Sequence, residues 1–395
     1  MKHLFVTQDY PPDRGGMARR HVELVRHFAN ASESMEVSTI TLDEAERFDA
    51  GESYAIHRQR FHFRAANRFT NQITWSRWLT AHARNNIDVI HCGNIRPAGY
   101  PVLWAKWRLG IPYLLYVNGG DLLRELQKTS RSRLKKTMAR RILGGASGIV
   151  ATSEWVADLS RQVMDNVGVK VQPPVNALAL GTDPVTFSPE RDTGAFRAKW
   201  GIANDPLLLT VARLIPHKGQ DVVIKALAKL RSGFPNLRYA LVGEGVDEPR
   251  LKNLVLELGV ADNVIFAGPL PDEELPEVYA TATIYAGPSR IDNEINAEGF
   301  GISFLEASAS GLPVVAGDSG GVRSAVRDGE TGIVLPPLDI DAWTSTIGEL
   351  LQSEPRRASL GNAGRRAVEA FYNWERVARD TREFTLQVVK SRQKS

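Results

Sequence analysis

Short runs of β-branched and aliphatic residues alternate with amphipathic segments along the first half of the chain. Apolar runs bounded by turn residues predict strands, and apolar positions that recur every three or four residues predict helices. The predicted strands are 4–7, 37–41, 88–92, 113–117 and 148–152. The predicted helices are 18–29, 71–84, 100–108, 132–143 and 154–165, and residues 49–68 are expected to be irregular or hairpin-like.

The same alternation restarts in the second half of the chain. Strands are predicted at 207–211, 239–242, 264–266, 283–286, 314–316 and 332–335, with helices between them and a last amphipathic helix at 374–389. Strands that alternate with helices predict parallel sheets covered on both faces. The fold class is therefore α/β, with two Rossmann-like, doubly wound parallel-sheet domains that face a cleft.

The expected boundary between the domains is the segment 172–189. It contains four prolines and Gly181, and no regular element is predicted within it, as is typical of a linker. The first domain is expected at 1–188 and the second at 189–373. Ligands of open parallel sheets bind beyond the carboxyl ends of the strands, so candidate site residues are sought there.

Composition narrows the class of protein. The chain has 395 residues, of which 43% are apolar and 24% are charged, which favours a globular protein of two domains. The single cysteine, Cys92, excludes an internal disulfide and fits a reducing compartment. No secretory signal and no apolar run of the ~18 residues that span a bilayer is found. A soluble, cytoplasmic protein is expected.

The net charge of +4 conceals a basic region. Residues 51–150 carry 17 basic and 4 acidic side chains, a balance of +13. One interpretation is a solvated basic face, and another is attraction to an anionic partner. In the helical segment 131–143, Leu134, Met138 and Ile142 form a stripe surrounded by cations, which favours a membrane surface. Nucleic acid is not favoured, because the segment lacks interleaved aromatic residues.

The segment 296–307, NAEGFGISFLEA, places two carboxylates eight residues apart. Gly299 and Gly301 are poor helix residues, so a tight turn should feed a helix that starts near residue 303. The N–H groups of Phe300, Gly301 and Ile302 would then point at an anionic or hydroxyl-rich ligand. Glu298 would accept hydrogen bonds from sugar hydroxyls, and Glu306 would bind a vicinal diol such as a ribose. Alternatively, Glu298 only stabilises the helix start and Glu306 is a surface residue.

Three other loops follow predicted strands. Gly15 and Gly16 follow the first strand and precede a helix, an arrangement suited to phosphate although no dinucleotide fingerprint is present. Arg213 and Lys218 follow strand 207–211 and would clamp a diphosphate, unless they are two solvent-facing cations. Glycines that follow two further strands would present backbone groups to a nucleobase, or are ordinary turns; they are Gly243 and Gly268.

Taken together, these motifs resemble those of retaining glycosyltransferase family 4, which has the GT-B fold. The resemblance rests on the E-x7-E pair Glu298 and Glu306 within EGFGISFLEASASGLPVVAGDSGG, and on VARLIPHKG, LVGEG, the Tyr-Pro-Pro…Gly-Gly loop and GTDPVTFSP. The segment 371–378 resembles the stretch where the last helix of such enzymes returns to the N-terminal domain. Residues 1–188 with 374–395 would thus bind the acceptor, and residues 189–373 would bind a nucleotide sugar.

The resemblance implies a role for each matching residue. Arg213 and Lys218 would bind the donor diphosphate, Glu306 the ribose, and Glu298 with the backbone of Phe300 and Gly301 the transferred sugar. Gly16 would approach the phosphate or the acceptor. Such enzymes, which include bacterial mannosyl, glucosyl and N-acetylglucosaminyl transferases, need no metal or cofactor, because fixed cations neutralise the leaving group. The anomeric configuration would be retained in a same-face displacement.

One position departs from the family pattern. A histidine usually begins the turn after strand 113–117, and here the turn reads Asn118-Gly-Gly-Asp121. Asparagine can hydrogen-bond a sugar hydroxyl but cannot carry a proton, while Asp121 keeps the acidic position.

The leading hypothesis is a retaining, metal-independent transfer of a hexosyl unit from a UDP- or GDP-sugar to a glycan or lipid-linked acceptor, peripheral to the inner face of the membrane. A phosphorylase or epimerase, and a non-catalytic protein that binds a nucleotide sugar or a membrane, are the alternatives.

Overall fold

The computed structural model describes residues 1–395 except 14, 31–33, 61–67, 85, 293–295 and 394–395. The chain forms two compact units, Met1–Leu178 with Trp374–Ser395, and Ala179–Asn373. The first boundary thus lies inside the proline-rich segment, before the predicted position at residue 188. Each unit is described by itself below, as unit 1 and unit 2.

Unit 1 is built on a parallel sheet with the strand order β3-β2-β1-β4-β5-β6-β7. Its strands are β1 (Lys2–Val6), β2 (Ser34–Ile40), β3 (Ile56–Gln59), β4 (Val89–Cys92), β5 (Tyr113–Val117), β6 (Gly148–Ala151) and β7 (Val175–Ala177). Its helices are α1 (Gly16–Asn30), α2 (Ala45–Asp49), α3 (Arg68–Ala83), α4 (Gly99–Leu109), α5 (Gly119–Ser130), α6 (Arg133–Gly145), α7 (Glu154–Val167) and α15 (Trp374–Gln393).

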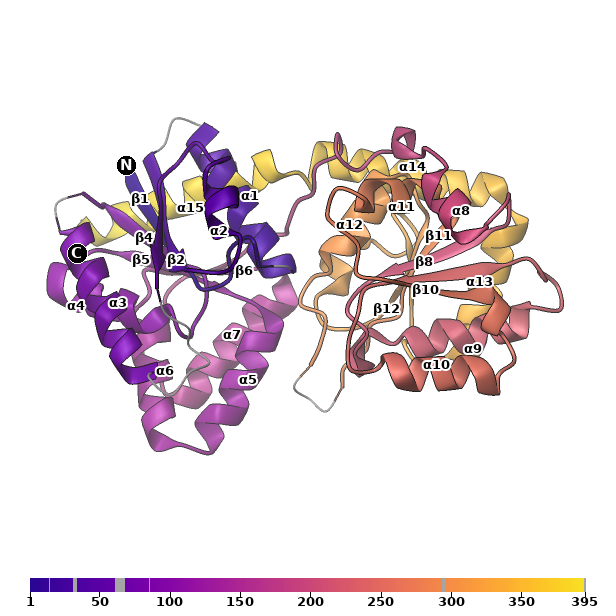
Figure 1. Cartoon of the computed structure of the whole chain (residues 1–395). Coiled ribbons are helices and arrows are strands. Elements are labelled where there is room, and N and C mark those ends of the chain that lie inside the picture. The colour runs from indigo at the N-terminus through magenta and orange to yellow at the C-terminus, as the bar shows by residue number, and fades with distance from the viewer. Residues whose placement is uncertain (14, 31–33, 61–67, 85, 293–295, 394–395) are drawn as a thin grey trace. The chain divides into compact units, whose positions relative to one another are not determined.

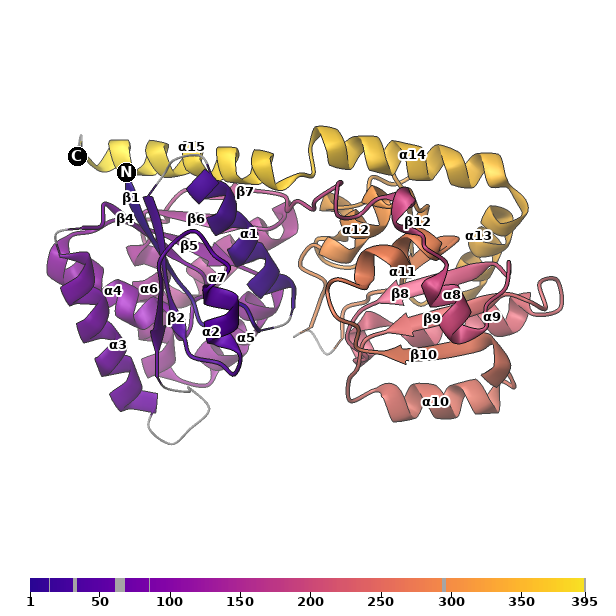
Figure 2. The ribbon, with the colours of Figure 1, turned by 45° about the horizontal axis from the view of Figure 1, so that its top comes forward.

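Helices cover both faces of this sheet because its strands are apolar on both sides. On one face, α1 packs against the C-terminal helix α15, which also contacts β6 (Figure 2). On the other face, α3, α4, α6 and α7 enclose a core that includes Trp75, Leu115 and Val163 (Figure 1). The predicted strands and helices of this half are confirmed, with ends displaced by a few residues.

Four elements described in unit 1 were not predicted: the short helix α2, β3, β7 and α5. The segment 49–68, expected to be irregular or hairpin-like, contains β3, which pairs in parallel with β2 at the edge of the sheet. The expected linker 172–189 contains the short edge strand β7, which pairs with β6. A helix, α5, begins directly after Asn118 although its first two residues are glycines, which are poor helix formers. Edge strands need few apolar residues, so neither β3 nor β7 has a strong pattern.

Unit 2 repeats the architecture with the strand order β10-β9-β8-β11-β12-β13, all parallel. Its strands are β8 (Leu207–Val211), β9 (Arg238–Val242), β10 (Val264–Gly268), β11 (Ile284–Gly287), β12 (Val314–Gly317) and β13 (Ile333–Leu335). Its α-helices are α8 (Ala195–Trp200), α9 (Gln220–Leu230), α10 (Glu248–Glu257), α11 (Leu275–Thr281), α12 (Ile302–Ala309), α13 (Ile340–Gln352) and α14 (Glu354–Ala370).

The core of unit 2 lies between its sheet and the helices α9, α10 and α13, and includes Val223, Leu251 and Trp343. Helices α11 and α12 lie on the opposite face (Figure 1), and α12 packs against α14. The predicted strands of this half are confirmed to within about two residues. The α/β fold class, with two doubly wound parallel sheets, is therefore confirmed.

Candidate active site

Both sheets have a position where the direction of strand succession reverses. In unit 1 this switch point lies between β1 and β4, and in unit 2 between β8 and β11. Loops that leave neighbouring strands in opposite directions open a crevice at the carboxyl edge, where ligands of such sheets bind. The loops after these strands carry most of the residues that the sequence predicted.

In unit 2, Lys218 and Glu298 come together across the switch point. Lys218 ends a short 3₁₀ helix, Pro216–Lys218, that follows β8, whereas Glu298 lies between β11 and α12. The Lys218 Nζ and the Glu298 Oε2 form an ion pair, with side chains 18% and 13% exposed, and Ser289 Oγ donates to the same carboxylate oxygen at 3.3 Å. Burial raises the pKa of Glu298, but the Lys218 charge and hydrogen bond, assisted by His217 and Ser289, outweigh it and hold that pKa below its usual range. The site thus holds an ionised carboxylate against an ammonium.

Arg213 and His217 lie on the same loop as Lys218. The Arg213 side chain is exposed, and its backbone carbonyl accepts a hydrogen bond from Gln220 Nε2 at 3.0 Å. Burial, together with the charges of Lys218 and Arg213, lowers the pKa of His217 to about 4. His217 is therefore neutral at neutral pH, and the positive charge of this loop resides on Arg213 and Lys218. His217 belongs to the VARLIPHKG motif, and no role was predicted for it.

Glu306 lies one helical turn inside α12 and is 2% exposed, so the alternative of a surface residue is wrong. Its Oε2 accepts a hydrogen bond from the Tyr279 hydroxyl at 2.7 Å. The neighbouring Tyr285 is affected by both carboxylates: burial raises its pKa, and the charges of Glu306 and Glu298 raise it further. The two carboxylates of the E-x7-E pair therefore belong to one electrostatic cluster around Tyr285.

Tight backbone turns complete this edge of the sheet. Gly301, with φ 90°, precedes α12, and a Cβ there would lie 2.4 Å from the Phe304 ring, so only glycine fits. Among the described residues, no backbone carbonyl accepts from the N–H groups of Phe300, Gly301 and Ile302, which stand at the start of the helix. Gly243 N, directly after β9, donates to the carbonyl of Gly268, the last residue of β10, at 2.8 Å.

The segment just before this turn is only partly described. Asp292 and Asn296 pair through two backbone hydrogen bonds of 2.9 and 3.1 Å. Residues 293–295, which lie between Asp292 and Asn296, are outside the described residues, as is Arg14 of the Gly-Gly loop in unit 1.

In unit 1, Asn118 and Asp121 stand at the start of α5. Asn118 Oδ1 accepts from Arg20 Nη1 at 3.2 Å, and Asp121 Oδ1 accepts from Arg124 Nη2 at 2.6 Å. The remaining Asn118 Nδ2 and Asp121 Oδ2 are buried, and no partner for them is found within the described chain. Buried polar atoms are normally hydrogen-bonded, so these two atoms are suited to a ligand.

Asp9, Asn94 and Arg20 belong to the same edge of unit 1 and were missed by the sequence analysis. Asp9 follows β1 and accepts at 2.8 Å from Nδ2 of Asn94, which follows β4. Burial chiefly raises the pKa of Asp9 to about 6, with a further contribution from the Asp121 charge. Arg20 reaches this edge from α1. The position of Asp9 and Asn94 directly after predicted strands was the signal that could have revealed them.

Gly15 and Gly16 lie at the exposed start of α1 in unit 1. Gly15 has φ 133°, a conformation that favours glycine, and its carbonyl accepts from Arg19 N at 3.1 Å.

The predicted apolar stripe on helix α6 is wrong in part. Ile142 is fully buried in the core of unit 1, whereas Leu134 is 74% exposed. The helix packs against α4 and α7 through Ala139, Ile142 and Leu143, which turns the stripe inward at its C-terminal end. Across the residues that the structure describes, no helix combines the length and the hydrophobicity needed to cross a membrane.

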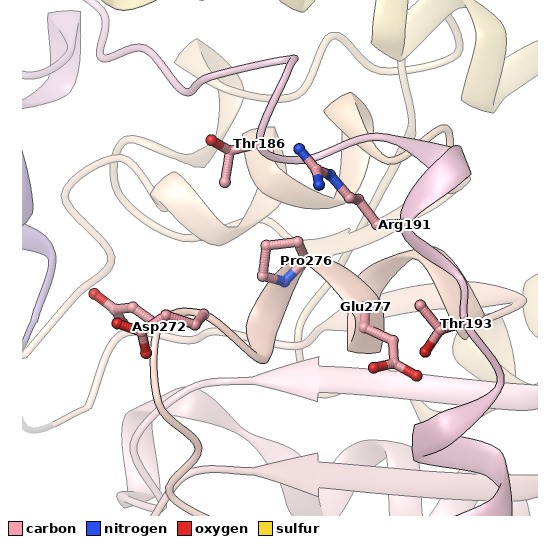
Figure 3. Close-up of a pocket in the computed structure, with 7 residues that line it drawn as sticks. Thr186, Arg191, Thr193, Asp272, Pro276 and Glu277 are labelled. Carbon is pink, nitrogen blue, oxygen red and sulfur yellow. The ribbon is translucent and has the colours of Figure 1, made fainter.

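A cavity of about 470 Å³ lies elsewhere in unit 2 (Figure 3). Two short segments line it: Thr186, Arg191, Thr193, Asp272, Glu273, Pro276 and Glu277. Glu277 Oε1 is engaged by the backbone N–H of Phe196 at 2.9 Å. None of the predicted site residues lines this cavity, and we assign it no ligand.

Comparisons with known proteins agree with this architecture. Residues 15–174 match the family described as "Glycosyl transferase 4-like domain", and residues 192–367 match "Glycosyl transferases group 1". The chain is 32% identical over 387 residues to the GDP-mannose-dependent alpha-(1-6)-phosphatidylinositol monomannoside mannosyltransferase of Mycolicibacterium smegmatis, with 96% of each chain covered. It is 33% identical over 330 residues to the D-inositol 3-phosphate glycosyltransferase of Stackebrandtia nassauensis, with 79% of this chain and 70% of that protein covered.

A solved structure of similar fold is Anabaena HepE in complex with UDP, with a TM-score of 0.78, 19% identity, and 98% and 100% of the two chains covered. The matched family descriptions span both units, and the first relative matches nearly end to end. The chain therefore belongs to the group 1, family 4-like glycosyltransferases, which have the GT-B fold.

Proposed function

We propose that this glycosyltransferase moves a mannosyl unit from GDP-mannose to a hydroxyl group of an inositol phosphate-containing acceptor, with retention of configuration and without a metal. The single observation that carries the proposal is the Lys218–Glu298 pair at the switch point of unit 2, beside the exposed Arg213. The choice of GDP-mannose over other donors follows the mycobacterial relative.

The chemistry assigned to unit 2 is electrostatic. A departing nucleoside diphosphate gains negative charge, which Arg213 and Lys218 would neutralise, so no divalent cation is needed. Glu298 would keep the ammonium of Lys218 oriented through their ion pair, and its other carboxylate oxygen would accept from a hydroxyl group of the sugar. The N–H groups at the start of α12 would complete the donor site. In a same-face displacement, the leaving phosphate would take the proton of the acceptor.

The acceptor class is inferred from the positive charge of unit 1 and from the two relatives, since both of their names mention an inositol that carries a phosphate. Residues 51–150 carry the balance of +13 and belong to unit 1. At its sheet edge, the buried Arg20 donates to Asn118 Oδ1, while Asn118 Nδ2 and Asp121 Oδ2 have no partner among the described residues. A polyol that carries a phosphate would satisfy such a mixture of donor and acceptor atoms.

The test is a panel of donors without metal. With a soluble inositol phosphate acceptor and EDTA, GDP-mannose should release GDP and give an α-linked product, as read by nuclear magnetic resonance, whereas UDP-glucose and UDP-N-acetylglucosamine should react at least tenfold more slowly. Preference for a UDP-sugar, loss of activity in EDTA or a β-linked product would contradict the corresponding part of the proposal. Tight binding of GDP-mannose without any transfer would instead support a non-catalytic binding protein.

We also propose that unit 1 docks on an anionic membrane through α4 and α6. Trp104 and Trp107 are 44% and 71% exposed on α4, with Arg108 near both rings. Helix α6 lies beside α4 and presents Leu134 among lysines and arginines. Amphipathic indoles surrounded by cations are typical of surfaces that lie in the lipid headgroup region.

Replacing both Trp104 and Trp107 by alanine is expected to weaken binding to vesicles that contain phosphatidylinositol about tenfold or more, because two indole rings lose their burial in the lipid interface. Co-sedimentation at low salt measures the effect. The control is Phe371→Ala, which removes an exposed aromatic ring from unit 2. Unchanged vesicle binding by the double variant, or no binding by the wild type, would refute the docking surface.

A further inference from the structure

Two histidines in unit 1 share one carboxylate. Glu36 Oε2 lies 2.9 Å from His57 Nε2 and 2.7 Å from His82 Nε2. One ligand atom from each of the three residues lies within 4.8 Å of the other two. The residues come from β2, β3 and the last turn of α3, and none of them belongs to the proposed donor or acceptor site.

The fold explains why these residues meet. Ser38 of β2 is paired with His57 of β3, so these two side chains point to the same face of the sheet. Glu36 stands two residues before Ser38 and therefore points to that face as well. Helix α3 lies across that face, because Trp75 Nε1 donates to Ser38 Oγ at 2.9 Å. His82 follows Trp75 by seven residues, two helical turns, and reaches Glu36.

The separations suit a metal ion. Zinc binds imidazole nitrogen and carboxylate oxygen at about 2.0–2.2 Å in a tetrahedral arrangement, which places neighbouring ligand atoms roughly 3.3 Å apart. The two Nε2 atoms already lie slightly nearer than that to the shared oxygen, so a small expansion would let one ion replace the two bridging protons. Each histidine would then be neutral, with its proton on Nδ1.

The surroundings meet two further requirements of a metal site. The Trp78 ring stacks on His82 with a centroid distance of 4.8 Å and lies 5.2 Å from His57, which restricts both imidazoles. The side chains of Glu36, His57 and His82 are 27%, 31% and 22% exposed, so an ion and a water ligand have access. Preformed ligands with a path of entry are what such a site needs.

We propose that Glu36, His57 and His82 form a zinc site with a water molecule as the fourth ligand. Two imidazoles favour zinc over magnesium or calcium, which prefer oxygen ligands. The bound ion would join the edge strand β3 to β2 and to the end of α3. It would therefore stabilise this edge of the sheet. It would take no part in glycosyl transfer, so a zinc site here is compatible with a transfer reaction that needs no metal.

The experiment uses the full chain after EDTA treatment and removal of the chelator. Competition with a chromophoric zinc indicator should show one tight site per chain, and Co²⁺ should give the strong visible absorption of a four-coordinate ion. His57→Gln and His82→Gln should each weaken zinc binding by more than the roughly 10–100-fold that the loss of an outer-shell partner costs. Zinc should also raise the Tm of the wild type but not of these variants.

His27→Gln is the matched control, because His27 Nδ1 lies 4.0 Å from Glu23 Oε2 and the described part of the chain places no metal-binding cluster there. This variant should leave zinc binding unchanged. Zinc binding equal to that of the wild type in both His57→Gln and His82→Gln overturns the proposal, as does a wild type without stoichiometric binding. If a variant fails to fold, the Co²⁺ spectrum of the wild type decides, since the weak absorption of a six-coordinate ion, or none, contradicts the three-ligand site.

Discussion

Replacement of Arg213 by alanine is expected to lower kcat for the proposed mannosyl transfer about 10²–10³-fold, because one of the two cations proposed to stabilise the leaving diphosphate is lost. The Arg213 side chain is exposed, so the Tm should stay within about 1 °C of the wild type by the usual tolerance of surface positions. Initial rates of GDP release, measured beside a thermal melt, separate the two effects. The activity loss should exceed any change in KM for the donor.

The matched control is Arg356→Ala. Arg356 is an exposed arginine at the start of α14 whose guanidinium pairs with Glu349 at 2.5 Å, and it is remote in sequence from the loop after β8. Its loss should leave kcat unchanged. Equal rates for Arg213→Ala and the wild type would remove Arg213 from the proposed site, whatever the donor.

Replacement of Lys218 by methionine is expected to have two consequences. The rate should fall at least about 100-fold, because the second cation is lost while the aliphatic volume is kept. The free energy of unfolding should also fall by about 1–3 kcal/mol, since Glu298 would remain largely buried without its ionic partner. Chemical denaturation and steady-state rates measure the two quantities separately.

The same variant changes the pH dependence of activity. In the wild type, Lys218 holds the pKa of Glu298 low against burial, and the stability that this provides is present above the pKa of the unfolded state and is lost as pH falls through the folded one. Without Lys218, burial raises the pKa, so the acid limb of the kcat profile should move to higher pH. Lys229→Met, which removes an exposed lysine paired with Asp341, should change neither the rate nor the profile. An unmoved acid limb in Lys218→Met would contradict the role of the pair.

The positions of the strands in both sheets were predictable from local patterns, because each strand of a doubly wound sheet is a short apolar run between turn residues. The segment 296–307 is the clearest case: the Gly299 and Gly301 pattern predicted a turn and a helix near residue 303, and α12 starts at Ile302. The loop that carries Arg213 and Lys218 was predicted at the carboxyl edge because it directly follows a predicted parallel strand.

Predictions failed where stability comes from neighbours distant in sequence. Strand β3 is fixed by pairing with β2, and its residues Ile56–Gln59 have no strand-like pattern of their own. Helix α6 shows the same limit, since the burial of Ile142 is decided by its packing against other helices of unit 1. The contact between Asp9 and Asn94 joins residues 85 positions apart.

By itself, the sequence determined the fold class and the family, because periodicity, turn glycines and short motifs are local properties of the chain. Only the tertiary structure decided that Glu298 forms an ion pair with Lys218 and that Glu306 is buried and hydrogen-bonded to Tyr279. It also decided that Glu36 contacts two histidines. Such facts depend on distances and burial, which arise when strand order brings remote segments to one edge or one face of a sheet.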